Sequence, residues 1–138
     1  MRNVKENLKS RIINEMAVDH ANSLERNLDI AKQFVRITKD GKVDVIIKDR
    51  VSGKLQILLY LIGKLYAKEA GLAGTQDVSN EELKDELGIP MGSILPWLKD
   101  LREQSGVKQV RNGRNTNHSL PAGYIEKVLK LVEKKIPK

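Results

Sequence analysis

The chain has 138 residues, of which 40% are hydrophobic and 4% aromatic, and a formal net charge of +7. This length suits one domain, or one domain with an appended arm, and a core made from Leu, Ile and Val favours packed helices over an aromatic-rich β-sandwich. Because the sequence has no Cys, disulfides, thiolate chemistry and Cys-ligated zinc are excluded. No stretch approaches the roughly 20 apolar residues of a membrane span, and the charged N-terminus lacks the apolar region of a signal peptide, so we expect a cytoplasmic protein that does not enter a membrane.

The positive charge is concentrated toward the C-terminus. Residues 105–138 contain 8 basic and 2 acidic side chains, whereas residues 53–104 contain 6 basic and 8 acidic ones. A basic surface attracts polyanions through counterion release, without any sequence preference. The alternative interpretation is a lysine-rich surface that only keeps the protein soluble.

Residues 1–33 are expected to form a helical arm. Apolar residues in steps of three and four form a heptad seam: Ala17, Ala21, Leu24, Leu28, Ala31 and Val35. An upstream apolar stripe has a spacing of four: Val4, Leu8, Ile12 and Met16. The stripes meet at the short polar side chains of residues 19–23, which compete with the backbone, so a break or bend into two helices is expected there. The arm either packs on the domain or pairs with its copy in a dimer, and we favour the dimer.

Residues 34–51 are predicted to be a β-hairpin that connects the arm to the domain. β-branched residues lie on both sides of Asp40-Gly41. An Asp-Gly pair tolerates the positive φ angles of a two-residue hairpin turn. No chemistry is indicated in this segment.

A strongly apolar helix is predicted over residues 52–70. One of its faces is formed by Leu55, Leu58, Leu59, Ile62, Leu65 and Tyr66. Ile57 and Leu61 extend the apolar surface around the side, so the helix should be buried from more than one direction. Gly71 can end it in the left-handed conformation, and Thr75–Val78 would be a short strand.

Two short helices in close succession are expected next. Ser79 and Glu82 are spaced as a capping box at the start of the first helix, and Gly88 ends it. Three apolar residues at steps of four and three face inward from the second helix: Ile94, Leu98 and Leu101. Gly106 ends this helix, and a β-hairpin begins at Val107.

The turn of this second hairpin is predicted at Asn112-Gly113, because Asn-Gly is a strong short-range hairpin signal. A two-residue turn at this position makes Arg111 and Arg114 cross-strand neighbours at the tip. Guanidinium groups on a thin ribbon can reach phosphates or enter a narrow minor groove. The alternative is a pair of solvated arginines on an ordinary surface turn.

The order of elements in residues 52–120 resembles the winged helix-turn-helix superfamily, as in small prokaryotic and archaeal transcription regulators of the MarR-like or ArsR-like kind. The resemblance implies a mostly α fold with a small β component (α+β), here with an extra N-terminal arm, a β-hairpin and a C-terminal helix. It further implies a transcription regulator that contacts double-stranded DNA through the second helix and a basic wing. The residues expected to contact DNA are Ser93, Lys99, Arg102, Lys108, Arg111, Asn112, Arg114, Asn115, Asn117 and His118.

Residues 121–138 are predicted to contain an amphipathic helix. Regulators of this superfamily often dimerise through terminal helices, so the resemblance implies a homodimer that uses the N- and C-terminal helices. The candidate interface residues are Leu24, Leu28, Ile125, Leu129 and Val132. Packing of the last helix on the core helix of the same chain is an equally supported alternative.

The outward face of the second helix is unusually apolar for a DNA reader, because Arg, Lys, Asn and Gln match base edges best. Pro96 would also disturb a regular helix, unless the helix starts near Ser93 and places Pro96 in its first turn. An alternative function is therefore a protein-interaction module that uses an apolar surface: Met91, Leu95, Pro96 and Trp97.

An enzyme is not expected. His20 and His118 lie far apart in the sequence, neither has the spacing of a metal ligand, and no cofactor motif occurs. A regulator that senses an apolar effector between the core and terminal helices stays open, although no polar constellation specifies such an effector.

Overall fold

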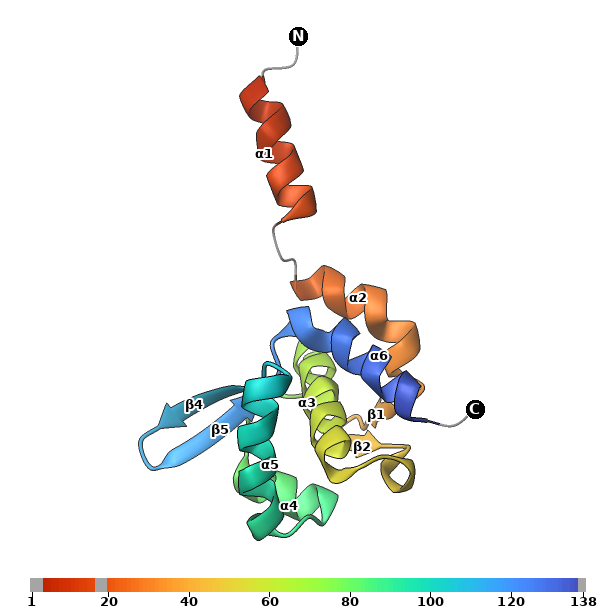
Figure 1. The fold of residues 1–138 in the computed structure, drawn as a ribbon, viewed down its shortest axis with the longest axis vertical. Coiled ribbons are helices and arrows are strands. Elements are labelled where there is room, and N and C mark those ends of the chain that lie inside the picture. The colour runs from red at the N-terminus through yellow and green to blue at the C-terminus, as the bar shows by residue number, and fades with distance from the viewer. Residues whose placement is uncertain (1–3, 17–19, 137–138) are drawn as a thin grey trace.

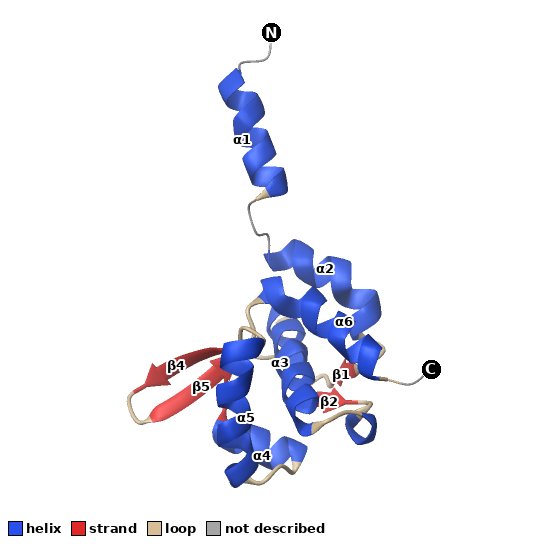
Figure 2. Ribbon diagram, viewed as in Figure 1, coloured by secondary structure: helices blue, strands red, loops and turns tan. Residues whose placement is uncertain are grey.

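A computed structural model describes residues 4–16 and 20–136 of the chain. Its described part is a mostly helical α+β structure with six α-helices and two small antiparallel sheets, as predicted (Figures 1 and 2). The helices are α1 (Val4–Glu15), α2 (His20–Ala31), α3 (Gly53–Glu69), α4 (Asn80–Leu87), α5 (Met91–Gln104) and α6 (Ile125–Lys135). The strands are β1 (Val35–Ile37), β2 (Val43–Val45), β3 (Val78–Ser79), β4 (Lys108–Asn112) and β5 (Asn115–Ser119). Short 3-10 turns occupy Lys48–Arg50 and Ala122–Tyr124.

Helix α3 forms the centre of the core. The side-chain oxygen of Ser52 caps its N-terminus by accepting a hydrogen bond from the Leu55 amide. The β1–β2 hairpin, α2, α4, α5 and α6 all contact α3, which confirms the prediction of a helix buried from several directions. Its contact with β2 is close, because a Cβ atom added at Gly63 would lie only 2.4 Å from Val43 Cγ1. Glycine at this position therefore lets the hairpin approach the helix.

The N-terminal arm is two helices, as expected, with α1 ending at Glu15 and α2 beginning at His20. Helix α1 projects away from the rest of the molecule (Figure 1). Its apolar stripe is exposed: Leu8, Ile12, Ile13 and Met16. The predicted heptad seam is wrong as one continuous stripe, because Leu24 and Ala31 are buried, Leu28 is 47% exposed and Val35 belongs to β1. Ala17 and the side chains of Val4 and Ala21 lie outside the described part.

Helix α6 packs on α2 and α3 within the chain. Four of the five residues predicted for a dimer interface are buried there: Leu24, Ile125, Leu129 and Val132. The Tyr66 hydroxyl on α3 also donates a 2.7 Å hydrogen bond to the Leu24 carbonyl on α2. The prediction that these four residues form a dimer interface is therefore wrong. An apolar stripe indicates that one face of a helix is covered, but not whether the same chain or a second copy covers it. Packing within one chain is confirmed, and dimerisation stays a prediction.

The β1–β2 hairpin is confirmed, with Val35 opposite Val45 and Ile37 opposite Val43. The predicted two-residue turn is wrong. The Thr38 amide donates to the Lys42 carbonyl, so the loop between them has three residues and ends at Gly41, whose φ is +84°. In such loops the last residue takes the left-handed conformation, which glycine adopts without steric cost.

The second sheet has the strand order β3-β5-β4. Val78 of β3 lies opposite His118 of β5, so the short strand before α4 pairs with the second hairpin, although it begins at Val78 instead of the predicted Thr75. The cap of α4 is confirmed as well, because Ser79 Oγ accepts a hydrogen bond from the Glu82 amide and Gly88 ends the helix at a φ of +68°. None of the described helices combines the length and the apolar character that a bilayer crossing requires.

Candidate nucleic-acid interface

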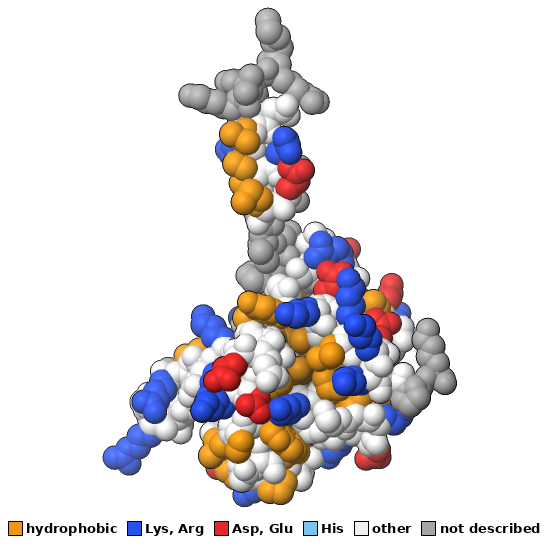
Figure 3. Space-filling model, in the orientation of Figure 1, with side chains coloured by type: hydrophobic (Ala, Val, Ile, Leu, Met, Phe, Trp, Pro, Cys, Tyr) orange, Lys and Arg blue, Asp and Glu red, His pale blue; other side chains and the backbone are white. Residues whose placement is uncertain are grey.

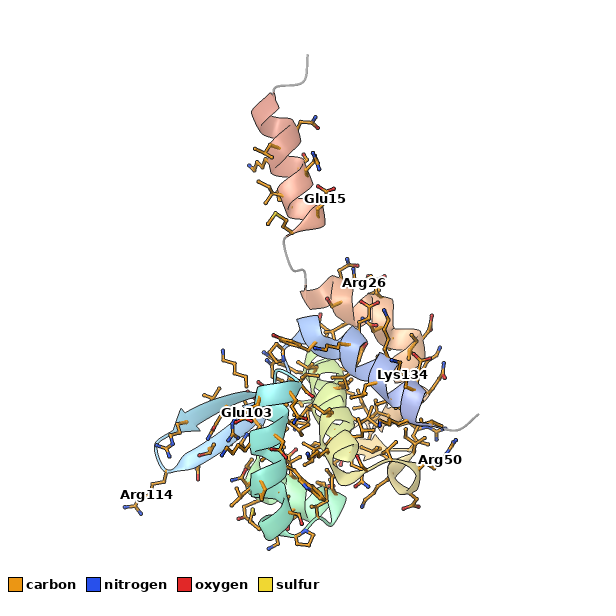
Figure 4. The ribbon with its side chains drawn as sticks, in the orientation of Figure 1. Glu15, Arg26, Arg50, Glu103, Arg114 and Lys134 are labelled. Atoms are coloured by element: carbon orange, nitrogen blue, oxygen red, sulfur yellow. The ribbon has the colours of Figure 1, made fainter. Side chains whose placement is uncertain are left out.

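The β4–β5 hairpin stands clear of the body of the molecule (Figure 1). Asn112 lies opposite Asn115, so the two central residues of the turn are Gly113 and Arg114. The prediction of the turn at Asn112-Gly113 is therefore wrong by one residue. Gly113 has a φ of +61°, and glycine at the first central position is the pattern of a type II′ turn. As a result, Arg114 lies at the tip and points away from the protein (Figure 4).

Arg111 is not the cross-strand partner of Arg114, because it lies opposite Thr116. Alternation along β4 places Arg111 on the same face as Gln109, and Gln109 lies opposite His118. This face also carries the buried Val78 at the base of the sheet. Gln109 and Arg111 are both exposed, and Arg111 lies farther from the base of the hairpin. Gln109 was not predicted as a site residue, although its spacing of two from Arg111 indicates a shared face.

His118 anchors the base of the hairpin. It is 2% exposed, and its Nε2 donates a 2.6 Å hydrogen bond to Asn80 Oδ1 at the start of α4. Burial, with a smaller contribution from the nearby positive charge of Arg102, lowers the pKa of His118 to about 4. The prediction of a surface histidine is wrong, because His118 lies next to Val78 of β3 and bonds to the start of α4. His118 is neutral at physiological pH and cannot contact DNA directly.

Helix α5 begins at Met91, and Pro96 lies inside it, so the prediction of a shorter helix starting near Ser93 is wrong. A proline ring displaces the carbonyl four residues earlier, which belongs here to Gly92. Gly92 is exposed, and a Cβ atom added to it would have no neighbour within 4 Å. The proline therefore lies beside an exposed turn of the helix and not beside a buried one.

The apolar surface predicted on α5 is smaller in the structure. A Cβ atom added at Gly53 would lie 2.2 Å from the Trp97 ring, so this ring packs directly on the start of α3. Met91 and Trp97 both pack against the core, whereas Leu95 is 51% exposed and Pro96 is also exposed. Of the four residues predicted for this surface, Leu95 and Pro96 are therefore the two that are exposed to a partner.

Three polar contacts fix α4 and α5 relative to α3. The Tyr60 hydroxyl donates a 2.6 Å hydrogen bond to Glu82 Oε2, and Lys64 Nζ lies 3.3 Å from the same oxygen. Burial raises the pKa of Tyr60, and the Glu82 carboxylate adds to that shift. Lys54 Nζ and Asp100 Oδ2 form a 2.9 Å ion pair between α3 and α5. Glu82 therefore faces the core instead of adding to the acidic outer surface of α4.

The surface charge of the hairpin has a single sign. Between Glu103 and Glu126 the sequence contains no acidic residue, and its three charged side chains are Lys108, Arg111 and Arg114. All three are exposed, and none forms an ion pair within the part of the chain that the structure describes. The charged side chains visible on the projecting hairpin in Figure 3 are accordingly Lys and Arg. Glu103, at the end of α5, borders this basic surface (Figure 4).

The ten residues predicted to contact DNA differ in their accessibility. Five are exposed: Lys99, Lys108, Arg111, Arg114 and Asn115. Three are half-buried: Ser93, Arg102 and Asn117. His118 is buried, and the side chain of Asn112 lies outside the described part. The exposed cations among these residues therefore lie on two elements. Lys99 is on α5, and Lys108, Arg111 and Arg114 are on the hairpin.

Among the described residues, no three His, Cys, Asp or Glu side chains lie close enough together to hold a metal ion. No protein-family model, curated protein or solved structure matches this chain. The function is therefore inferred from the residues and the fold of the chain itself.

Proposed function

We propose that this protein is a winged helix-turn-helix regulator of transcription that binds double-stranded DNA. The observation that carries the proposal is the β4–β5 hairpin, which stands clear of the core and whose charged side chains are all basic. In this proposal α4 and α5 form the helix-turn-helix, and the hairpin is the wing.

The order of elements supports the proposal. Helix α3 is followed by β3, α4 and α5, and the sheet then closes with β4 and β5 in the order β3-β5-β4. In a helix-turn-helix the second helix enters the major groove, here with Lys99 exposed. Arg111 and Arg114 would contact phosphates or a narrow minor groove beside it.

The composition of α5 indicates how specific the binding should be. Leu95 and Pro96 on its exposed face have no donor for a base edge, although they can contact thymine methyl groups. Most of the affinity would then come from phosphate contacts of the cationic side chains. We expect modest sequence preference and strong dependence on salt concentration.

Fluorescence anisotropy of a labelled duplex, titrated with protein at several salt concentrations, tests this proposal. In Arg111→Ala/Arg114→Ala, the slope of log K against log salt should decrease in magnitude by about 2, because each arginine supplies roughly one phosphate contact. Lys39→Ala/Lys42→Ala is a matched control, since it removes two exposed cations from the turn of the β1–β2 hairpin. A protein that does not retain duplex DNA at low salt, or equal slopes for the two double variants, would refute the proposal.

A further inference from the structure

A groove with an apolar floor lies between the C-terminal end of α5, the start of α3 and α6. Its two parts have volumes of 340 and 450 Å³, and both are lined by Gln104, Ser105 and Leu131. Leu131 is 38% exposed, although it is a large apolar side chain. The remaining apolar lining includes Leu55, Leu58, Leu101 and Val128. Figure 3 shows hydrophobic side chains gathered between α5 and α6, with Lys and Arg side chains around them.

Every charged residue that lines the groove is basic. Lys127, Lys130 and Lys134 line one part, and Arg50, Lys54 and Lys135 line the other. Lys130 is paired with Glu126 at 3.4 Å and Lys54 with Asp100 at 2.9 Å. Within the described residues, Lys127, Lys134 and Lys135 form no ion pair, so their positive charge is not neutralised by the protein itself.

We infer that this groove binds an acidic amphipathic helix of a partner protein. Such a helix places apolar residues spaced i, i+3, i+4 and i+7 on an apolar floor, and acidic residues beside them would face the lysines. Both parts of the groove are open to solvent. A small apolar ligand is usually buried over most of its surface, so the open shape favours a helix over such a ligand.

The α1 helix of this chain, or of a second copy, is a poor occupant. It has an unpartnered apolar stripe that includes Leu8 and Ile12. Its charged residues, however, are Lys5, Lys9 and Arg11 against Glu6 and Glu15, so it is net basic. Charge complementarity therefore selects an acidic partner over this helix.

The groove and the basic hairpin are separate surfaces. In Figure 1, β4–β5 lies on one side of α5, and α6 lies on the other. A partner helix and duplex DNA could be bound together, and the inference about the groove does not depend on the proposed DNA binding.

The probe for this inference is a labelled synthetic helical peptide with leucines at the i, i+3, i+4 and i+7 positions and glutamates on its flanks. A second peptide has lysine in place of every glutamate. Anisotropy measures affinity, and methyl NMR reports contact at Leu131. The acidic peptide should bind at least about tenfold more tightly than the basic one. Leu131→Ala and Lys127→Glu/Lys134→Glu should each weaken binding by about tenfold.

The matched control is Lys39→Glu/Lys84→Glu, which makes the same change in net charge at exposed positions outside the groove and should leave peptide binding unchanged. No shift of the Leu131 methyl signals with acidic peptide up to about 1 mM would overturn the inference. Equal affinity for the acidic and basic peptides would also overturn the inference. So would an equal loss of affinity for the acidic peptide in the groove variants and in the control variant. Self-association that requires Leu131 would assign the groove to a second copy. A further competition uses the Arg111→Ala/Arg114→Ala variant. If duplex DNA displaces the peptide from this variant, the lysines of the groove would be assigned to nucleic acid.

Discussion

β1–β2 and β4–β5 are two antiparallel hairpins of one chain, and each has a glycine with positive φ in its turn, at +84° for Gly41 and +61° for Gly113. The first packs on α3 and buries Val35, Val43 and Val45. The second projects from the body and exposes most of the side chains at its outer end.

The apolar content of the strands accounts for this difference. In β1–β2 the alternate positions on one face are β-branched apolar residues, three valines and Ile37, so the ribbon has a face to bury. The ten residues of β4 and β5 include one apolar side chain, Val110, and the anchoring contacts are confined to the base of the hairpin. A ribbon that buries little has a cost in stability, and the basic residues at its outer end are what a phosphate-binding role would require.

Charge reversal at each hairpin should give the largest contrast. Arg111→Glu/Arg114→Glu should weaken duplex binding on the order of 100-fold at low salt, because two phosphate contacts become repulsions. Lys39→Glu/Lys42→Glu should change affinity less than about threefold. Neither should alter the free energy of unfolding by more than about 0.5 kcal/mol, since all four side chains are exposed. Anisotropy and urea unfolding measure both quantities, and equal losses of affinity would remove the distinction between the hairpins.

Acid should destabilise the base of the projecting hairpin. The pKa of His118 is about 4 in the folded protein and about 6.5 in the unfolded chain, so the unfolded state binds more protons between these values. The contribution of neutral His118 is therefore fully present above pH 6.5 and is lost as the pH falls toward 4. We expect a loss of roughly 2 kcal/mol between pH 7 and pH 5 from this group, measured by urea unfolding. In His118→Gln this part of the pH dependence should disappear, and an unchanged profile would show that His118 does not titrate in this way.

The packed hairpin should respond to volume instead of charge. Gly63→Ala places a methyl group against Val43 and should lower the free energy of unfolding by about 1–2 kcal/mol, even though alanine favours helix. Val43→Ala makes room, so the double variant should be more stable than the sum of the single effects predicts, by about 1 kcal/mol. A double-mutant cycle from urea unfolding measures this coupling. Additive effects would mean that β2 moves aside without cost.

A smaller effect is expected on α5. Lys99→Ala should weaken duplex binding by about three- to tenfold and reduce the magnitude of the salt slope by about 1. Its matched control is Lys84→Ala on α4, another exposed helical lysine. If Lys99→Ala weakens binding more than the hairpin double variant does, the helix and not the hairpin dominates the contact with DNA.

Local signals predicted much of the fold. The capping residues Ser79 and Gly88, the apolar pattern of α3 and the break before α2 all depend on nearby residues, and the structure confirms them. The turn of β4–β5 was predicted one residue too early. Gly113 can take a positive φ as either the first or the second central residue of a two-residue turn, so the glycine alone does not fix the turn. The strand register fixes it, through cross-strand pairs such as Asn112 with Asn115.

Features that depend on distant contacts were not predictable in the same way. His118 is buried beside its strand partner Val78, which lies 40 residues earlier in the chain. The stripe of α6 indicates an apolar face, yet nothing in its spacing shows that α2 and α3 of the same chain cover Leu129. The groove around Leu131 also arises only when α3, α5 and α6 meet.

The most direct test of the DNA interface is an NMR titration of ¹⁵N-labelled protein with a short duplex at low salt. Contact through the hairpin and α5 predicts the largest amide and arginine side-chain shifts at Arg111, Gly113 and Arg114, with further shifts near Lys99. The β1–β2 turn around Lys42 should give none. Shifts confined to β1–β2 or to the α6 groove, with the signals of Arg111 and Arg114 unchanged, would contradict the account.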